Sequence, residues 1–229
     1  MSRYRLSIVI PVYGKFNFTS ACLNDLFRLP TDHEIIIVDN ASDDNTINLA
    51  NITRPNFVYI RNNENEGFAR ACNRGFRAAQ GRAVMFLNND IRVQDSHETW
   101  TEAILEQTKE NCLVGPTVGV LNERFDFIKE SNSFEGNYCY MSGWNLTGLK
   151  ESLEKLVLGD DEGPFSTEFG KAYFEDTDMS FRAKELGFEF KVQSVPVIHF
   201  GRVTSNSVGL SALYLPAKQL FIQKWAGKV

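Results

Sequence analysis

The chain has 229 residues, of which 43% are hydrophobic and 23% are charged, and its formal net charge is −5. This composition is typical of a globular protein with a full apolar core, and it excludes a disordered tail or a fibrous repeat. The negative charge also argues against nucleic-acid binding, which calls for a basic patch or stripe. We therefore expect one globular domain over residues 1–229 that binds no nucleic acid.

The four cysteines, Cys22, Cys72, Cys112 and Cys139, form no close pair and no Cys-x-x-Cys motif. This spacing argues against a zinc ribbon or a dithiol redox site and favours reduced, buried thiols. No run reaches the roughly 18 apolar residues of a transmembrane segment. The short apolar start also lacks the cleavage site of a signal peptide. A cytoplasmic location is predicted, and peripheral contact with a membrane and the oligomeric state are left open.

The first ninety residues alternate between short apolar runs and amphipathic segments. Strands are predicted at 6–12, 34–38, 57–61 and 83–87, and helices at 17–27, 46–51 and 67–80. Because this alternation builds β–α–β units, we expect an α/β fold with a mostly parallel sheet flanked by helices. Ligands of such sheets bind beyond the carboxyl ends of the strands, which here are residues 11–13, 39–40 and 88–90.

The second half of the chain has a looser pattern. After a helix at 96–111, capped by Ser96, a hairpin is predicted from strands 118–121 and 124–128. Residues 139–144 are expected to return to the sheet. A helix at 175–186, strands at 189–192 and 195–199, and a helix at 210–225 interrupted near Pro216 complete the prediction.

Several polar side chains stand where these strands end. Asp39 could accept a hydrogen bond from the N–H of a uracil-like base, or it could simply close a turn. Asp90 could hold a divalent cation that also grips a diphosphate, or it could lie in a surface turn. His199 could complete that metal site, although a histidine at a strand end more often serves the structure.

Three carboxylates, Glu175, Asp176 and Asp178, fall within four positions at the predicted start of a helix. The helix dipole favours acidic residues there, which is a sufficient structural reason for them. One of them could instead be a general base that takes the proton of an attacking hydroxyl. The spacing leaves both interpretations open, and composition alone favours the structural one.

Five sequence blocks occur in a characteristic order: residues 7–13 (SIVIPVY), 37–44 (IVDNASDD), 65–75 (NEGFARACNRG), 86–90 (FLNND) and 173–182 (YFEDTDMSFR). His199 and the terminal Lys224-Trp225 follow them. Together they resemble the family 2 glycosyltransferases, which have the GT-A fold. The resemblance covers nearly the whole chain and is weakest from about residue 118 to residue 169.

The resemblance implies an inverting transfer of a hexose or deoxyhexose from a nucleotide-diphosphate donor, with UDP- or dTDP-sugars favoured. The acceptor would be a glycan or lipid-linked hydroxyl, as in polysaccharide biosynthesis. Residues 1–116 would bind the nucleotide-sugar, and residues 117–229 would bind the acceptor and carry the catalytic groups.

The resemblance also assigns individual residues. Asp176 would be the catalytic base with Glu175 beside it, and Asp90 and His199 would hold Mn²⁺ or Mg²⁺. The positions that match nucleotide-binding residues are Pro11, Val12, Tyr13, Asp39, Asn40, Asn73, Asn88 and Asn89. Trp144 falls on the acceptor side, where it would either stack on a sugar face or be a buried core residue.

One position departs from the family pattern. Asn88 stands where the Asp-x-Asp motif has its first acid, so the motif carries one charge fewer. We expect a lower metal affinity, with the metal held largely by the diphosphate. The competing interpretations are a catalytically silent glycosyltransferase-like binding module and a nucleotidyltransferase. A Rossmann oxidoreductase is disfavoured because no Gly-x-Gly-x-x-Gly follows the first strand.

Overall fold

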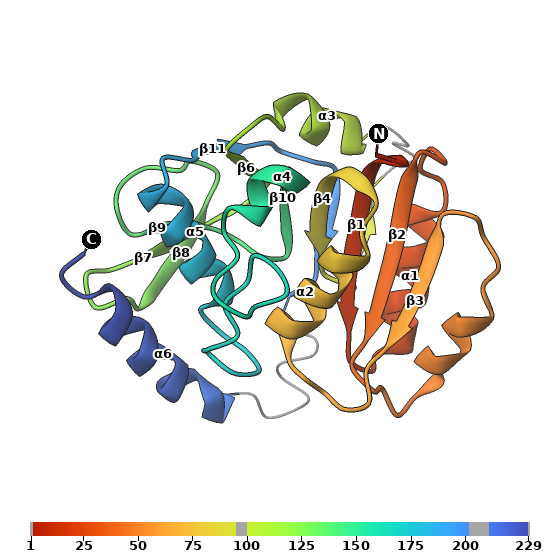
Figure 1. Ribbon diagram of the computed structural model, residues 1–229, viewed down its shortest axis with the longest axis horizontal. Coiled ribbons are helices and arrows are strands. Elements are labelled where there is room, and N and C mark those ends of the chain that lie inside the picture. The colour runs from red at the N-terminus through yellow and green to blue at the C-terminus, as the bar shows by residue number, and fades with distance from the viewer. Residues whose placement is uncertain (1, 95–99, 202–210, 229) are drawn as a thin grey trace.

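The computed structural model describes residues 2–94, 100–201 and 211–228 (Figure 1). Its centre is a seven-stranded sheet in the order β11-β6-β10-β4-β1-β2-β3. These strands are β1 (Tyr4–Val12), β2 (His33–Asp39), β3 (Phe57–Arg61), β4 (Gly81–Leu87), β6 (Cys112–Gly115), β10 (Asn145–Leu149) and β11 (Glu189–Val192). All neighbouring pairs are parallel except those of β10, which runs antiparallel to β4 and β6. The predicted α/β class with a mostly parallel sheet is confirmed.

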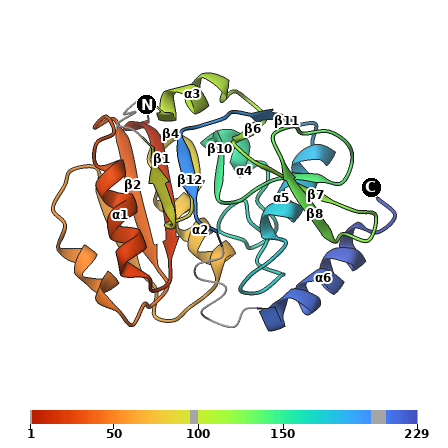
Figure 2. The ribbon, with the colours of Figure 1, turned by 180° about the vertical axis from the view of Figure 1, so that it is seen from behind.

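Helices cover both faces of this sheet, as the opposite views in Figures 1 and 2 show. They are α1 (Phe16–Leu26), α2 (Phe68–Ala78), α3 (Trp100–Gln107), α4 (Lys150–Glu154), α5 (Glu175–Glu185) and α6 (Ser211–Trp225), and residues Asn45–Asn51 form the 3₁₀ helix η1. Alternate residues of β1 enter separate apolar clusters, Ile8 and Ile10 on one face and Val9 on the other. A strand buried on both faces reads as a continuous apolar run, which is why β1 was predictable.

Helix α2 packs unusually close to the sheet. A Cβ atom on Gly75 would lie 2.3 Å from a methyl carbon of Val9, so only glycine fits there. At the start of α2, Gly67 has a φ of +90°, and a Cβ atom would lie 2.4 Å from the Lys171 backbone. The amide of Phe68 donates to the Lys171 carbonyl at 3.0 Å. The first turn of α2 is thereby joined to the segment that precedes α5.

The second half corrects several predictions. Strands β7 (Val118–Leu121), β8 (Phe127–Ser131) and β9 (Cys139–Met141) form a separate three-stranded sheet. The prediction that residues 139–144 rejoin the main sheet is wrong, because β9 pairs with β7 and the following strand β10 makes the return. The hairpin is confirmed, although its second strand begins at Phe127 and not at residue 124. Helix α4 was not predicted. Ser96, the predicted cap, lies outside the described residues.

A short two-stranded sheet places His199 beside the end of β4. Strand β5 (Ile91–Val93) pairs antiparallel with β12 (Val197–His199), with His199 opposite Ile91. The amide of Phe200 then donates to the Asp90 carbonyl at 3.0 Å. Strand β5 was not predicted, since three residues are too short for a period to show.

The final helix, α6, is joined to α5 by aromatic and polar contacts. Phe221 packs edge-on against Phe181, with ring centroids 5.3 Å apart. The indole N–H of Trp225 donates to the buried carboxylate of Asp178 at 2.9 Å. None of the helices in the described part of the chain combines the length and apolar character that crossing a bilayer demands.

Candidate active site

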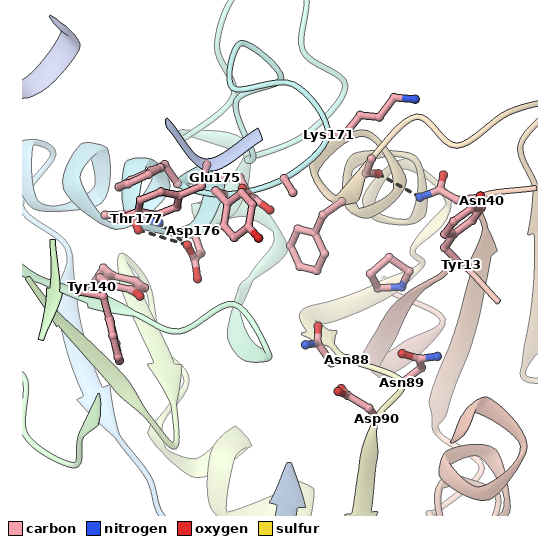
Figure 3. Close-up of a pocket in the computed structure, with 18 of the residues that line it drawn as sticks. Tyr13, Asn40, Asn88, Asn89, Asp90, Tyr140, Lys171, Glu175, Asp176 and Thr177 are labelled. Atoms are coloured by element: carbon pink, nitrogen blue, oxygen red, sulfur yellow. Dashed lines mark hydrogen bonds between the residues drawn. The ribbon is translucent and has the colours of Figure 1, made fainter. Parts of the chain in front are cut away.

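A cavity of about 460 Å³ opens at the carboxyl ends of β1 and β4. One wall carries Tyr13 after β1 and residues 88–90 after β4, and the opposite wall carries Tyr140 and Asp176 (Figure 3). The predicted residues that line it are Pro11, Val12, Tyr13, Asn40, Asn88, Asn89, Asp90, Glu175 and Asp176. The cavity thus joins the two parts of the chain, as expected for a sheet whose strand ends meet at one edge.

Four other predicted residues, Asp39, Asn73, Trp144 and His199, do not line this cavity. Conversely, Tyr140, Lys171, Thr177 and Tyr214 line it and were not predicted. Tyr140 belongs to the small sheet and Tyr214 to α6, so their place depends on how these elements pack. Nothing in the local sequence pattern signals it.

The turn after β1 is held by two side chains that follow β2. The amide of Gly14 donates to the Ser42 hydroxyl at 2.7 Å, and the amide of Phe16 donates to Asp44 at 2.8 Å. Asp44 also caps η1 by accepting from the Thr46 amide at 3.0 Å. The cavity wall that carries Tyr13 is therefore braced by the segment after β2.

Asp39 is fully buried at the end of β2, beneath the cavity wall. Its carboxylate accepts hydrogen bonds from the Ser42 amide at 2.9 Å and from the Tyr59 hydroxyl at 2.5 Å, and it pairs with Arg61. Burial and the hydrogen bond to Asp39 raise the pKa of Tyr59 to about 12. A base that binds Asp39 must therefore share or replace one of these partners.

The amides of the nucleotide-binding set have different surroundings. Asn40 donates to the Gly67 carbonyl at 3.1 Å, which joins β2 to the start of α2. Asn89 donates to the Thr19 hydroxyl at 2.8 Å and is largely buried. Asn73 lies away from the cavity and forms a pair of bonds with the Phe165 backbone, 2.7 Å to its carbonyl and 3.1 Å from its amide. In this structure Asn73 braces a loop.

Asp90, which lines the cavity, lies beside His199, which does not. Their atoms Oδ1 and Nε2 are 3.2 Å apart, and the Asn88 amide nitrogen lies 3.3 Å from the same Nε2. Nε2 has a single bonding position in the plane of the ring, so it can bond either the Asn88 amide or the Asp90 carboxylate but not both. Asp90 Oδ1 is also buried, with no hydrogen-bond partner among the described residues.

The Asp90 carboxylate and the His199 imidazole could together bind a hard divalent cation. Two ligands of one octahedral ion are about 3 Å apart, close to the Asp90–His199 separation. In residues 2–94, 100–201 and 211–228, no group of three or more His, Cys, Asp or Glu side chains could enclose a metal ion. An ion here would need further ligands from water or from a bound phosphate.

Helix α5 begins at the opposite wall with Glu175 and Asp176. Tyr173 and Phe174 before it both have positive φ, +75° and +67°, which turns the chain sharply into the helix. Asp176 accepts from the Gly143 amide at 2.9 Å and from its neighbouring Thr177 amide at 2.7 Å. Glu175 Oε2 is buried and has no partner among the described residues.

These surroundings raise the pKa of both carboxyl groups. Burial raises the pKa of Asp176, while the hydrogen bonds from the Gly143 and Thr177 amides act in the opposite direction. Burial, and then the nearby Asp176 carboxylate, raise the pKa of Glu175 to about 8. At neutral pH Glu175 therefore keeps its proton. Asp178 points elsewhere, to Arg182 and Trp225.

The raised pKa of Glu175 makes the free energy of unfolding depend on pH. Its folded pKa, about 8, exceeds the ordinary 4.5, so between these values the folded state binds more protons than the unfolded state. The free energy of unfolding should therefore decrease as pH rises from about 5 to 8, and Glu175→Gln should reduce that decrease. Urea unfolding at several pH values measures this free energy in each protein. Glu185→Gln, an exposed position of the same helix, is the control, and equal slopes in all three proteins would contradict the prediction.

The chain was compared with known proteins. Residues 7–171 match the family model described as glycosyl transferase family 2. The uncharacterized protein Rv1525 of Mycobacterium tuberculosis is 28% identical over 211 residues, which cover 88% of this chain and 76% of that protein. The uncharacterized glycosyltransferase YibD of Escherichia coli is 32% identical over 109 residues, which cover 46% of this chain and 32% of YibD.

Two solved structures show the same fold. The mannosyltransferase PcManGT from Pyrobaculum calidifontis, solved with GDP-Man and Mn²⁺, has a TM-score of 0.63 at 19% identity, covering 84% of this chain and 55% of that one. S. aureus TarS 1–349, solved with UDP-GlcNAc, has a TM-score of 0.60 at 16% identity, covering 83% and 56%. The chain thus spans a little over half of each. The family match covers more than half of the chain, and the protein belongs to glycosyl transferase family 2.

Proposed function

We propose that this protein transfers a sugar from a nucleotide-diphosphate donor to a hydroxyl group of a glycan or lipid-linked acceptor, with inversion. The observation that carries the proposal is one cavity in which the strand ends of the N-terminal half face the half-buried Asp176. Membership of glycosyl transferase family 2 supports the reaction class. The donor would bind against Tyr13 and residues 88–90, and the acceptor on the side of Tyr140 and Tyr214.

Asp176 is suited to act as the general base. An acceptor hydroxyl beside it would lose its proton to the carboxylate as its oxygen attacks the anomeric carbon. The bond from that carbon to the diphosphate oxygen breaks on the opposite face, which inverts the configuration. The amides of Gly143 and Thr177 hold the carboxylate in one orientation. Glu175, protonated at neutral pH, can donate a hydrogen bond to a sugar hydroxyl without adding charge.

Asp90 and His199 would hold Mn²⁺ or Mg²⁺. The ion would neutralise negative charge that develops on the departing nucleotide diphosphate. Asn88 carries no charge but lies within reach of His199 Nε2 and so helps to set the direction of that ring. The solved relative PcManGT contains Mn²⁺, which supports a divalent ion without choosing between the two.

The base of the donor stays open between pyrimidines and guanine. The hydrogen bond proposed between Asp39 and a uracil-like base favours UDP- or dTDP-sugars. Of the related structures, PcManGT holds GDP-Man and TarS holds UDP-GlcNAc, so the fold accommodates either base. Arg61, paired with Asp39, adds donors beside that carboxylate and would help to select the base.

A thermal-shift panel with UDP, dTDP, GDP and CDP, each with and without Mn²⁺, tests the donor site. We expect one nucleotide with metal to raise the melting temperature, because a ligand at a hundred times its Kd adds about 2.7 kcal/mol of stability. Asp90→Ala should lose the metal-dependent part of the shift, and Asp160→Ala, in an exposed loop, should retain it. No shift with any nucleotide would contradict the proposal and favour a silent binding module.

A further inference from the structure

The turn between β9 and β10 touches three parts of the proposed active site. The Gly143 amide donates to Asp176 Oδ2 at 2.9 Å. The Trp144 carbonyl accepts from the Asn88 amide at 2.9 Å, at the end of β4. The Trp144 indole lies against the His199 imidazole, with ring centroids 4.7 Å apart and planes inclined by 11°. These three partners come from α5, β4 and β12.

We infer that Gly143 and Trp144 are positioning residues that align the general base and the metal-binding histidine with each other. Trp144 sets the plane of the His199 ring so that Nε2 points toward Asp90. Gly143 sets the orientation of the Asp176 carboxylate. Because the two residues are adjacent, one short segment holds both Asp176 and His199 and fixes their positions relative to each other. This inference rests on the proposed function, since it assumes that His199 binds metal and that Asp176 is the base.

His199 needs such support because its own strand is short. Strand β12 has three residues and, within the part of the chain that the structure describes, pairs only with β5. Ile198 and Phe200, on either side of His199, are 43% and 53% exposed. Among the described residues, the ring nitrogen Nε2 contacts Asn88 and Asp90, and no hydrogen bond to Nδ1 is present. A metal-ligating histidine is usually held by a bond from its second nitrogen. Here the stacked indole supplies the constraint on the ring plane.

Trp144 itself is firmly placed. Its side chain is 7% exposed and belongs to the apolar cluster on the α1 face of the sheet. Its carbonyl is bonded to Asn88, and the next residue, Asn145, is paired with Leu87 in the sheet. The indole therefore moves with the end of β4, which also carries Asp90. A stacked pair at this separation has favourable geometry for aromatic rings.

Gly143 has little room for a side chain. A Cβ atom there would lie 3.1 Å from the Asp176 Cβ and 3.2 Å from its Oδ2. The carboxylate is thus packed directly on the peptide that holds it. Gly143→Ala would displace Asp176 without touching His199, whereas a change at Trp144 would remove the ring stacked on His199 together with its packing in the apolar cluster. The two substitutions should therefore have separable effects.

Mn²⁺ binding tests the role of Trp144. The protein is titrated with Mn²⁺ alone, and the free ion is measured by electron paramagnetic resonance. Trp144→Leu should raise the Kd about tenfold, the lower end of the range for supporting residues of metal sites, and Trp144→Phe, which keeps a stacked ring, should largely restore binding. Near-ultraviolet circular dichroism verifies folding. The Phe variant keeps the test informative if the Leu variant does not fold.

A double-mutant cycle with His199→Ala shows whether Trp144 acts through His199. We expect Trp144→Leu to cause no further loss of Mn²⁺ affinity once His199 is gone. An equal loss in both backgrounds, or no loss in either, would overturn the inference while leaving the metal site in place. Unchanged affinity in His199→Ala alone would instead remove His199 from the metal site of the proposed function.

Gly143→Ala supplies the complementary measurement. We expect kcat to fall by less than the roughly 10²-fold that a 1 Å displacement of a catalytic group can cost, with Mn²⁺ affinity and the KM for the donor unchanged. Ser142→Ala, the preceding residue, is the matched control and should behave as the native protein. A fall in Mn²⁺ affinity with unchanged kcat would overturn the role inferred for Gly143.

Discussion

Asp176→Asn is expected to lower kcat by about 10²- to 10⁴-fold, the range that a general base contributes. The amide has the shape of the carboxylate and can still accept the hydrogen bond from the Gly143 backbone. It cannot take a proton, so the attacking hydroxyl stays protonated. Initial rates of sugar transfer measure the loss, and the nucleotide-dependent thermal shift should be unchanged because the substituted atoms lie across the cavity from residues 88–90.

The control for this experiment is Asp160→Asn, which changes an exposed acid in the loop before α5 and should keep full activity. Full turnover by Asp176→Asn would remove Asp176 as the base. Loss of nucleotide binding together with turnover would instead indicate that the substitution disturbs the donor wall.

Asp178→Ala is expected to lower the free energy of unfolding by about 3–5 kcal/mol, the cost of breaking a buried ion pair from one side. Asp178 is fully buried, and its Oδ2 accepts from Arg182 Nε at 2.7 Å. Its other oxygen accepts from the Trp225 indole at 2.9 Å and lies 2.8 Å from Lys224 Nζ. Removing the carboxylate leaves the guanidinium of Arg182 charged and buried, and it detaches the end of α6 from α5.

Urea denaturation measures this change. Glu162→Ala, which breaks the exposed pair with Arg77, is the control and should alter stability little. Asp178→Leu combined with Arg182→Met should be less destabilised than Asp178→Ala, because no unpaired charge then remains in the core. A loss below 1 kcal/mol in Asp178→Ala would contradict the prediction.

The ion pair of Asp178 also explains why the acidic cluster could not be interpreted from spacing. Glu175, Asp176 and Asp178 lie within one turn of α5, so a helix places them in three directions. Asp176 faces the cavity, Glu175 is buried beside it, and Asp178 turns to Arg182 and α6. The sequence left the structural and the catalytic interpretations open. In the structure each of the three carboxylates has a different environment.

The first half of the fold was predictable because it obeys local rules. Strands β1, β2 and β4 are continuous apolar runs, and α2 repeats its apolar residues at helical spacing. Each element can therefore be predicted from a short stretch of sequence. Parallel pairing then brings the residues after β1 and β4 to one edge of the sheet. This is why Tyr13 and residues 88–90 could be placed in a common site.

The rest depended on contacts between distant segments. The structure assigns β9 to the small sheet, inserts β10 antiparallel and pairs β5 with β12. Each of these strands has only three to five residues. Such strands are too short for periodicity to distinguish one partner from another. The division into a nucleotide-sugar part over residues 1–116 and an acceptor part over 117–229 stays a prediction, as does the cytoplasmic location.

By itself, then, the sequence determined the family, the fold class and the set of residues at the strand ends, because these depend on motifs and on local apolar periodicity. Only the tertiary structure decided which of those residues face the cavity. In that structure Asp39 pairs with Arg61, Asn73 bonds the Phe165 backbone, and Trp144 stacks on His199. The direction of a polar side chain is set by the partner that satisfies it when it is buried, and that partner comes from a distant part of the chain.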